Sequence, residues 1–145
     1  MEKYFNAYGF IMVLVILIPN IVFAMTCKDG FVNKYQNKVV ETLEQVGRFG
    51  CFICMFFLLP WFDRGFWFPH GKTVYLIAGA ALVALYCLGW IIFWKENSIR
   101  KSLFLSVVPS ILFLESGIVT GYVLLLLFAL LFAPCHILIS VRNAV

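Results

Sequence analysis

The sequence predicts an all-α integral membrane protein, built as a single bundle of five transmembrane helices. Its 145 residues are 63% hydrophobic and 12% charged, and the mean hydropathy is +0.99. Soluble domains are roughly 45–50% apolar and about 25% charged. Apolar runs long enough to cross a bilayer recur along the chain. Because no hydrophilic stretch is long enough to form a second, soluble domain, we expect residues 1–145 to form one membrane domain.

The first three helices are predicted at 5–25, 38–62 and 74–94, since a membrane helix needs about 20 mostly apolar residues. The first is expected to be retained, because its apolar run exceeds the roughly 7–15 residues of a signal peptide. The second is expected to begin about two turns before its apolar run, because polar residues at helical spacing precede Val46.

The last apolar stretch, 103–141, contains a single acidic residue, Glu115. One helix of this length would measure about 58 Å, nearly twice the thickness of the hydrocarbon core. The stretch is therefore expected to fold back, either at the sequence ESG that begins with Glu115 or, as a second choice, at Gly121. The first choice predicts helices at 102–115 and 118–141, with Glu115 at the hairpin tip, either solvated or relaying protons.

The basic residues divide unequally between the two ends of such a bundle. The end with the amino terminus would hold Lys3, Arg64 and Lys72. The other end would hold most of them: Lys28, Lys34, Lys38, Arg48, Lys95, Arg100, Lys101 and Arg142. Cytoplasmic loops carry an excess of Lys and Arg, so we expect a multi-pass protein of the cell (inner or plasma) membrane with its N-terminus outside and its C-terminus cytoplasmic. A net charge of +4 is too small to indicate nucleic-acid binding.

Polar residues gather near the predicted cytoplasmic end of the second helix. Glu41, Glu44, Gln45 and Arg48 share a sector apart from the apolar one. Glu44 and Arg48 are four residues apart and can form an ion pair on one helix face. One interpretation is a solvated amphipathic segment whose arginine reaches the lipid headgroups. The other is that this sector walls a cytoplasm-facing pocket.

Asn20 and His136 favour the pocket, because polar residues inside a membrane tend to face the bundle interior. Each closely follows a proline, Pro19 or Pro134. Since a proline leaves the carbonyl four residues before it without a donor, both side chains also fit a structural role as caps. Two more polar residues follow His136 on the same helix face: Ser140 and Asn143. No acid or histidine lies at ligand spacing from His136, so no metal site is expected.

Cys51 and Cys54 have the CxxC spacing of thiol redox pairs, which makes a membrane thiol oxidoreductase an alternative function. Three arguments weigh against it. The predicted side of the membrane is the reducing cytoplasm. Cysteine in an apolar helix commonly acts as a small hydrophobe. Residues three apart on a helix rarely form a disulfide without distortion.

Four stretches together resemble a known group of sequences: IPNIVFA at 18–24, NKVVETLEQVGRFG at 37–50, PSILFL at 109–114 and APCHILIS at 133–140. In these stretches, which lie along most of the chain, the sequence is similar to small multi-span membrane proteins of Gram-positive bacteria that have no known activity. The resemblance implies a shared polar core: Asn20, Glu44, Gln45, Arg48 and His136.

The leading functional hypothesis is the binding or passage of a small amphiphile or lipid headgroup. Arg48 would pair its anionic group, while Glu44 and Gln45 orient it. The alternatives are the thiol oxidoreductase and a non-catalytic subunit of a membrane complex. The expected partners are the lipid bilayer and either another membrane protein or further copies of the chain, and no nucleic acid. No phosphate-binding loop, catalytic triad or zinc-protease motif occurs, so the sequence assigns no enzyme class and no cofactor.

Overall fold

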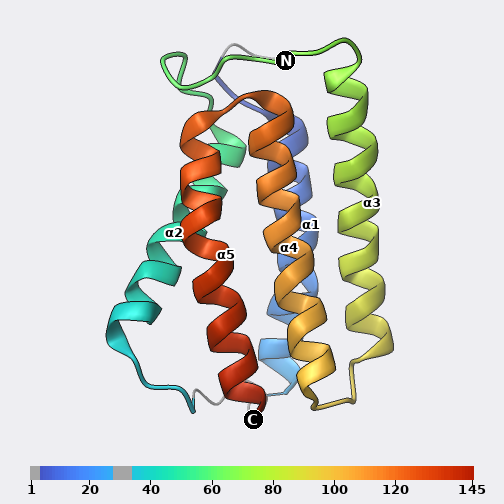
Figure 1. The fold of residues 1–145 in the computed structure, drawn as a ribbon. Coiled ribbons are helices and arrows are strands. Elements are labelled where there is room, and N and C mark those ends of the chain that lie inside the picture. The colour runs from blue at the N-terminus through green and yellow to red at the C-terminus, as the bar shows by residue number, and fades with distance from the viewer. Residues whose placement is uncertain (1–3, 28–33) are drawn as a thin grey trace.

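The computed structural model describes residues 4–27 and 34–145, which form five α-helices (Figure 1). The helices are α1 (Ala7–Thr26), α2 (Lys38–Phe56), α3 (Gly71–Ile92), α4 (Ile99–Thr120) and α5 (Val123–Ala144). Within the described ranges the β-structure is limited to two isolated bridges. The prediction of an all-α bundle is therefore confirmed.

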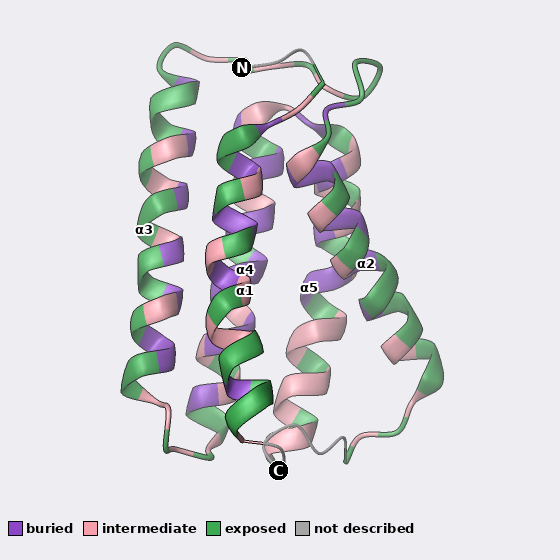
Figure 2. Cartoon of the chain, turned by 180° about the vertical axis from the view of Figure 1, so that it is seen from behind, coloured by how far each residue is buried: buried purple, intermediate pink, exposed green. Residues whose placement is uncertain are grey.

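The five helices close into a ring. α1 packs against α2 and α3, α3 packs against α4, α4 against α5, and α5 against α2. Buried side chains face the interior of this ring, and exposed side chains face outward (Figure 2). α4 is the most enclosed of the apolar helices. In its most apolar stretch 56% of the residues are buried, against 28% or less in the corresponding stretches of α1, α3 and α5. The ring therefore has a packed interior, and its outer surface is largely apolar.

Four of the helices, α1, α3, α4 and α5, are long and apolar enough to cross a membrane, which indicates a membrane protein. α2 does not meet this criterion, because charged residues occupy its first half. Its outward surface is nevertheless mainly apolar, through exposed side chains: Val39, Leu43, Val46, Phe49 and Ile53. The charged residues and the apolar residues of α2 thus occupy different faces of one helix.

α2 ends at Phe56, well short of the predicted residue 62. The chain becomes extended at Phe57, which forms an isolated antiparallel bridge with Phe5. The backbone N–H of Asn6 donates to the carbonyl of Phe56 at 2.8 Å. The segment before α1 therefore replaces the next helical turn as the hydrogen-bonding partner, and Pro60 prevents the helix from resuming.

The reversal between the last two helices lies at Gly121, so the first-choice break at Glu115 is wrong and the second choice is correct. Gly121 adopts the left-handed conformation (φ 66°) that glycine reaches without strain. Gly117 stays helical and lets α5 approach, since a Cβ there would lie 3.0 Å from the backbone nitrogen of Leu126. Glu115 lies inside α4, and both of its carboxyl oxygens are buried and not solvated at a tip.

One end of the bundle, where α1 and α3 begin, is called the sealed end here. The α4–α5 turn is bonded to the α2–α3 loop across it. The Tyr122 hydroxyl donates to the carbonyl of Phe57 at 3.1 Å and accepts from the N–H of Leu59 at 3.2 Å. The indole N–H of Trp67 donates to the carbonyl of Ile118 at 2.7 Å. Backbone groups of both loops are therefore satisfied within the protein.

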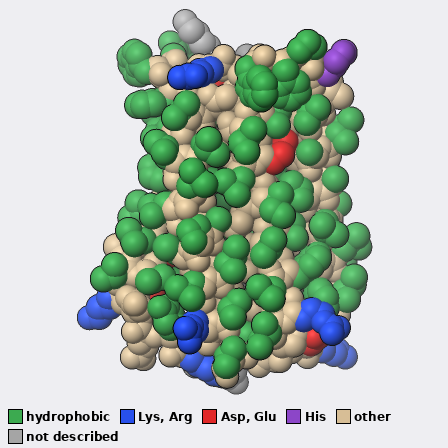
Figure 3. Space-filling view, in the orientation of Figure 1, with side chains coloured by type: hydrophobic (Ala, Val, Ile, Leu, Met, Phe, Trp, Pro, Cys, Tyr) green, Lys and Arg blue, Asp and Glu red, His purple; other side chains and the backbone are tan. Residues whose placement is uncertain are grey.

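The opposite end, where α1, α3 and α5 finish and α2 and α4 begin, is called the cavity end. Lys and Arg side chains gather there (Figure 3). Most of the described cations belong to it: Lys34, Lys38, Arg48, Lys95, Arg100, Lys101 and Arg142. The first half of α2 leans away from the other helices at this end, as both ribbon views show.

Candidate functional site

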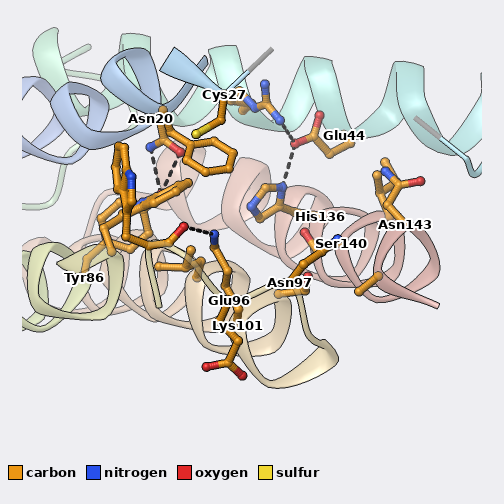
Figure 4. A pocket seen from close by; sticks show the side chains of 18 of the residues that line it. Asn20, Cys27, Glu44, Tyr86, Glu96, Asn97, Lys101, His136, Ser140 and Asn143 are labelled. Atoms are coloured by element: carbon orange, nitrogen blue, oxygen red, sulfur yellow. Dashed lines mark hydrogen bonds and ion pairs between the residues drawn. The ribbon is translucent and has the colours of Figure 1, made fainter. Parts of the chain in front are cut away.

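A cavity of about 500 Å³ lies at the cavity end, between the ends of all five helices (Figure 4). Every residue that the sequence predicted for a binding pocket lines it: Asn20, Glu41, Glu44, Gln45, Arg48 and His136. Ser140 and Asn143 line it as well, as expected from their helix face. The polar residues of three helices that are far apart in the sequence therefore meet around one space.

The path of α2 creates part of this space. Asn37 caps the helix, because its Oδ1 accepts from the N–H groups of Val39 and Val40 at 3.2 and 3.3 Å. Ten residues after Asn37, α2 contacts α5 closely at Gly47. A Cβ at this position would lie 2.8 Å from the backbone of Phe132. Before Gly47 the two helices diverge, and polar side chains fill the wedge between them.

Glu44 is the centre of the polar network in this wedge. Its side chain is only 3% exposed, although it stands on the charged face of α2. Its Oε1 accepts a hydrogen bond from the Arg48 guanidinium, so the predicted ion pair is confirmed. The same oxygen lies 2.9 Å from Nδ1 of His136 on α5. Since a carboxylate can only accept, Nδ1 carries the proton of this bond. The charged face of α2 points into the bundle.

The imidazole ring is also held from its other side. It stacks on Phe132, with ring centroids 4.5 Å apart and an interplanar angle of 20°. Stacking fixes the ring plane, and the Nδ1 bond to Glu44 fixes its rotation. The second nitrogen, Nε2, therefore has a defined position within the cavity lining.

The predicted role of Asn20 and His136 as proline caps is wrong. Asn20 donates to the carbonyl of Ile16 at 2.7 Å, which is not the carbonyl that Pro19 leaves free, and to the hydroxyl of Tyr86 at 2.8 Å. It therefore joins α1 to α3. His136 bonds to α2 and not to its own helix. Both side chains act between helices, which the sequence could not show.

Asn143 closes one edge of the cavity. Its Oδ1 accepts from the backbone N–H of Lys34 at 2.9 Å and of Tyr35 at 2.8 Å. These bonds attach the segment before α2 to the last turn of α5. The position at which α2 starts, and with it the width of the wedge, therefore depends on the end of α5.

The wall opposite α2 contains residues that the sequence did not assign to the pocket. It is aromatic and cationic, and it comes from α1, α3, the loop after α3, and α4: Phe23, Trp90, Trp94 and Lys101. The sequence counted Lys101 only as a loop cation. Its burial depends on rings that belong to two other helices, so no local pattern around Lys101 signals it.

The two redox candidates lie elsewhere. Cys51 and Cys54 are buried in the hydrophobic core of the ring and are not part of the cavity lining. All five cysteines of the chain are free. In the described part of the chain, no group of three or more His, Cys, Asp or Glu side chains is arranged to hold a metal ion.

Comparisons with protein-family models, with curated proteins and with solved structures found no match for this chain. The class is therefore defined by the fold and the site alone. The protein is an apolar helical bundle with four helices capable of crossing a membrane, and it carries a polar and aromatic cavity at its cation-rich end.

Proposed function

We propose that this chain is a five-span protein of the cell (inner or plasma) membrane that binds the polar group of a small amphiphile or lipid in a cytoplasm-facing cavity. One observation carries the proposal. Polar side chains predicted from three separate helices line a single cavity in a bundle whose outer surface is apolar. A ligand with a polar group and an apolar remainder matches both surfaces.

A fifth span requires α2 to cross the membrane despite its charges. Most of its exposed residues from Val39 to Ile53 are apolar, as lipid contact requires, and two polar ones, Thr42 and Gln45, are exposed beside them. Three of its charged residues, Glu41, Glu44 and Arg48, line the cavity, where Glu44 is paired with Arg48 and His136. Charged groups inside membranes are tolerated when they face the bundle interior and pair with one another, which supports α2 as a span.

The proposed orientation is N-terminus outside and C-terminus cytoplasmic. The gathering of cations at the cavity end supports it, because positive charge favours the cytoplasmic side. In this orientation the cavity lies at the level of the cytoplasmic headgroups, where it is accessible to lipids and to soluble molecules. Its volume of about 500 Å³ lies within the range of roughly 300–1,000 Å³ typical of small-molecule sites.

The binding hypothesis is tested by filling the cavity. Ser140 lines it, whereas Leu138, on the same helix, is exposed and does not. We expect Ser140→Trp to reduce several-fold the phospholipid that remains bound after mild detergent purification, measured by native mass spectrometry. The matched variant Leu138→Trp should retain lipid as the parent protein does. Equal lipid retention by both variants would contradict the proposed function.

The orientation is tested with a membrane-impermeant maleimide on intact cells. Cys27 lines the cavity and is read in a variant that lacks the other four cysteines. The control is a cysteine at position 61 of the sealed end, where Trp61 is highly exposed. We expect position 61 to label in intact cells and Cys27 to label only after the cells are opened. The reverse pattern would invert the topology.

A further inference from the structure

The wall of the cavity formed by α3 and α4 contains a buried positive charge. Lys101, in the first turn of α4, is only 8% exposed. Its Nζ donates to the backbone carbonyl of Trp94 at 3.3 Å. Among the described residues, no carboxylate lies within ion-pair distance of it. Glu96, nearby in the sequence, accepts from the hydroxyl of Ser98. An ammonium has three donors, so this one retains hydrogen-bonding capacity.

Aromatic rings hold this ammonium in place. Nζ lies 4.4 Å from the ring centroid of Phe23 and 5.1 Å from that of Trp90. The two rings are themselves in contact, with centroids 4.8 Å apart, and Trp94 packs against both. Cation–π attraction positions the charge and offsets part of its desolvation, but it does not neutralise it. The charge is therefore fixed in position, and no described carboxylate forms an ion pair with it.

Trp90, on the same wall, has a buried N–H group without a hydrogen-bond acceptor in the described part of the chain. Its side chain is 4% exposed, and its indole Nε1–H has no acceptor in hydrogen-bond geometry among the described residues. The hydroxyl of Tyr86, one turn away, lies near this N–H, but its own hydrogen bonds in good geometry are exchanged with Asn20. A buried donor without an acceptor destabilises a protein, so native structures rarely retain one unless a ligand or water satisfies it. Trp90 and Lys101 line the same cavity.

Arg48, on the opposite wall, differs from Lys101 because it has a carboxylate partner. Its guanidinium is already paired with Glu44, which also contacts His136. A ligand anion at Arg48 would compete with a directly bonded carboxylate, whereas Glu96 acts on Lys101 only from beyond ion-pair distance. The cavity's buried donors that have no bonded carboxylate therefore lie on the α3–α4 wall.

We infer that the ligand of this cavity presents a phosphate-type oxyanion to Lys101 Nζ and Trp90 Nε1, and that Arg48 belongs to the structural network with Glu44. A phosphate group offers only acceptor oxygens and carries the missing negative charge. The inference rests on the proposed function and deepens it by naming the chemistry of the bound group. The oxyanion is borne either by a lipid headgroup or by a soluble molecule.

The test measures binding of phosphatidylglycerol and phosphatidylcholine to the full-length, delipidated protein in a neutral detergent. We expect anionic phosphatidylglycerol to bind more tightly than zwitterionic phosphatidylcholine. Lys101→Gln should weaken phosphatidylglycerol binding about tenfold or more, the effect of losing a hydrogen bond to a charged group. The control Arg100→Gln removes the same charge one residue away, outside the cavity lining, and should leave binding unchanged.

Trp90→Phe is the second variant, because it keeps an aromatic ring beneath the ammonium and removes the N–H. We expect it to weaken phosphatidylglycerol binding about five-fold, because the phosphate loses one hydrogen-bond donor. If Lys101→Gln does not fold, Trp90→Phe and the charge-conserving Lys101→Arg, expected to retain binding, decide the question. Inorganic phosphate added as a competitor distinguishes the two sources. Competition at millimolar concentration supports a soluble phosphate compound, and its absence supports the lipid headgroup.

Two outcomes separate this inference from the proposed function. If Ser140→Trp abolishes lipid binding while Lys101→Gln and Trp90→Phe bind phosphatidylglycerol normally, the cavity binds lipid but the oxyanion does not lie at Lys101. If Ser140→Trp also binds normally, both proposals fail.

Discussion

The two ends of this bundle are stabilised by different kinds of hydrogen bond. At the sealed end the bonds between the two loops end on backbone groups, such as the carbonyl of Phe57 and the N–H of Leu59, which Tyr122 joins, and one side-chain pair, Asn6 with Tyr75, joins α1 to α3. At the cavity end the bonds between helices join side chains to one another, as between Glu44 and His136. Backbone groups must be satisfied in any folded state, whereas side-chain groups can exchange partners with a ligand.

Stability and ligand binding are therefore expected to depend on different ends of the bundle. Substitutions at the sealed end leave buried backbone groups unpaired and should lower stability without changing the cavity. Substitutions on the cavity wall should change ligand binding, with smaller effects on stability. The exceptions are residues that position α2, because the wedge that forms the cavity depends on this helix.

The largest effect is expected at Gly47, where α2 meets α5 beside the cavity. A Cβ there would lie 2.8 Å from the backbone of Phe132, and backbone cannot rotate aside as a side chain does. We expect Gly47→Leu to lower the free energy of unfolding by about 3 kcal/mol, the upper part of the range for overpacking. Thermal unfolding in detergent micelles measures it.

The neighbouring Val46 provides the control, because its side chain is about half exposed on the outward face of α2. Val46→Leu should unfold within a few degrees of the parent protein. An unfolding temperature for Gly47→Leu as high as that of Val46→Leu would show that α2 does not approach α5 as described.

Glu44 should have the next largest effect. Glu44→Gln leaves Arg48 and the protonated Nδ1 of His136 without their carboxylate. Breaking a fully buried ion pair costs roughly 3–5 kcal/mol, and because Arg48 is one-third exposed we expect about 2 kcal/mol here. Lys38→Gln, an exposed charge change on the same helix, should stay within about 0.5 kcal/mol. Equal stability of the two variants would mean that the network does not stabilise α2.

Tyr122→Phe tests the contribution of the sealed end to stability. The variant keeps the buried ring and removes only the hydroxyl that bonds to Phe57 and Leu59. We expect a loss of about 1–2 kcal/mol in unfolding free energy, because two backbone groups lose a partner. Bound phospholipid, measured by native mass spectrometry, should equal that of the parent protein. Lost lipid with unchanged stability would reverse the assignment of roles to the two ends.

The sequence predicted those parts of the molecule that depend on local composition and spacing. Helical periodicity was sufficient to place the polar sector of α2 and the Glu44–Arg48 pair, because both depend only on residues four or fewer apart. The break at Gly121 was missed as first choice, because Gly117 satisfies a packing requirement that only the path of α5 creates. The end of α2 was missed for a similar reason, since the segment at Phe5 pairs with Phe57.

Of the two walls of the candidate site, the sequence predicted one and missed the other. Its acidic and histidine wall was predicted, because charged and polar residues stand out within apolar helices. Its aromatic wall was not, because Trp90 and Phe23 resemble ordinary apolar residues of a membrane span. Lys101 resembles an ordinary loop cation until Phe23 of α1 packs beside it. Contacts between helices distant in the sequence decide these roles.

The smallest expected effects come from a matched pair on two helices. α1 is joined to α3 by Asn6 with Tyr75 at the sealed end (3.0 Å) and by Asn20 with Tyr86 at the cavity end (2.8 Å). Each tyrosine to phenylalanine change should lower stability by about 1 kcal/mol or less. Only Tyr86→Phe should alter lipid binding, because Tyr86 lines the cavity and Tyr75 does not. Since chemistry and helix pair are the same, a difference in lipid binding between the two variants reports the difference between the ends. Equal lipid binding would show that the Asn20–Tyr86 bond serves only to join the helices.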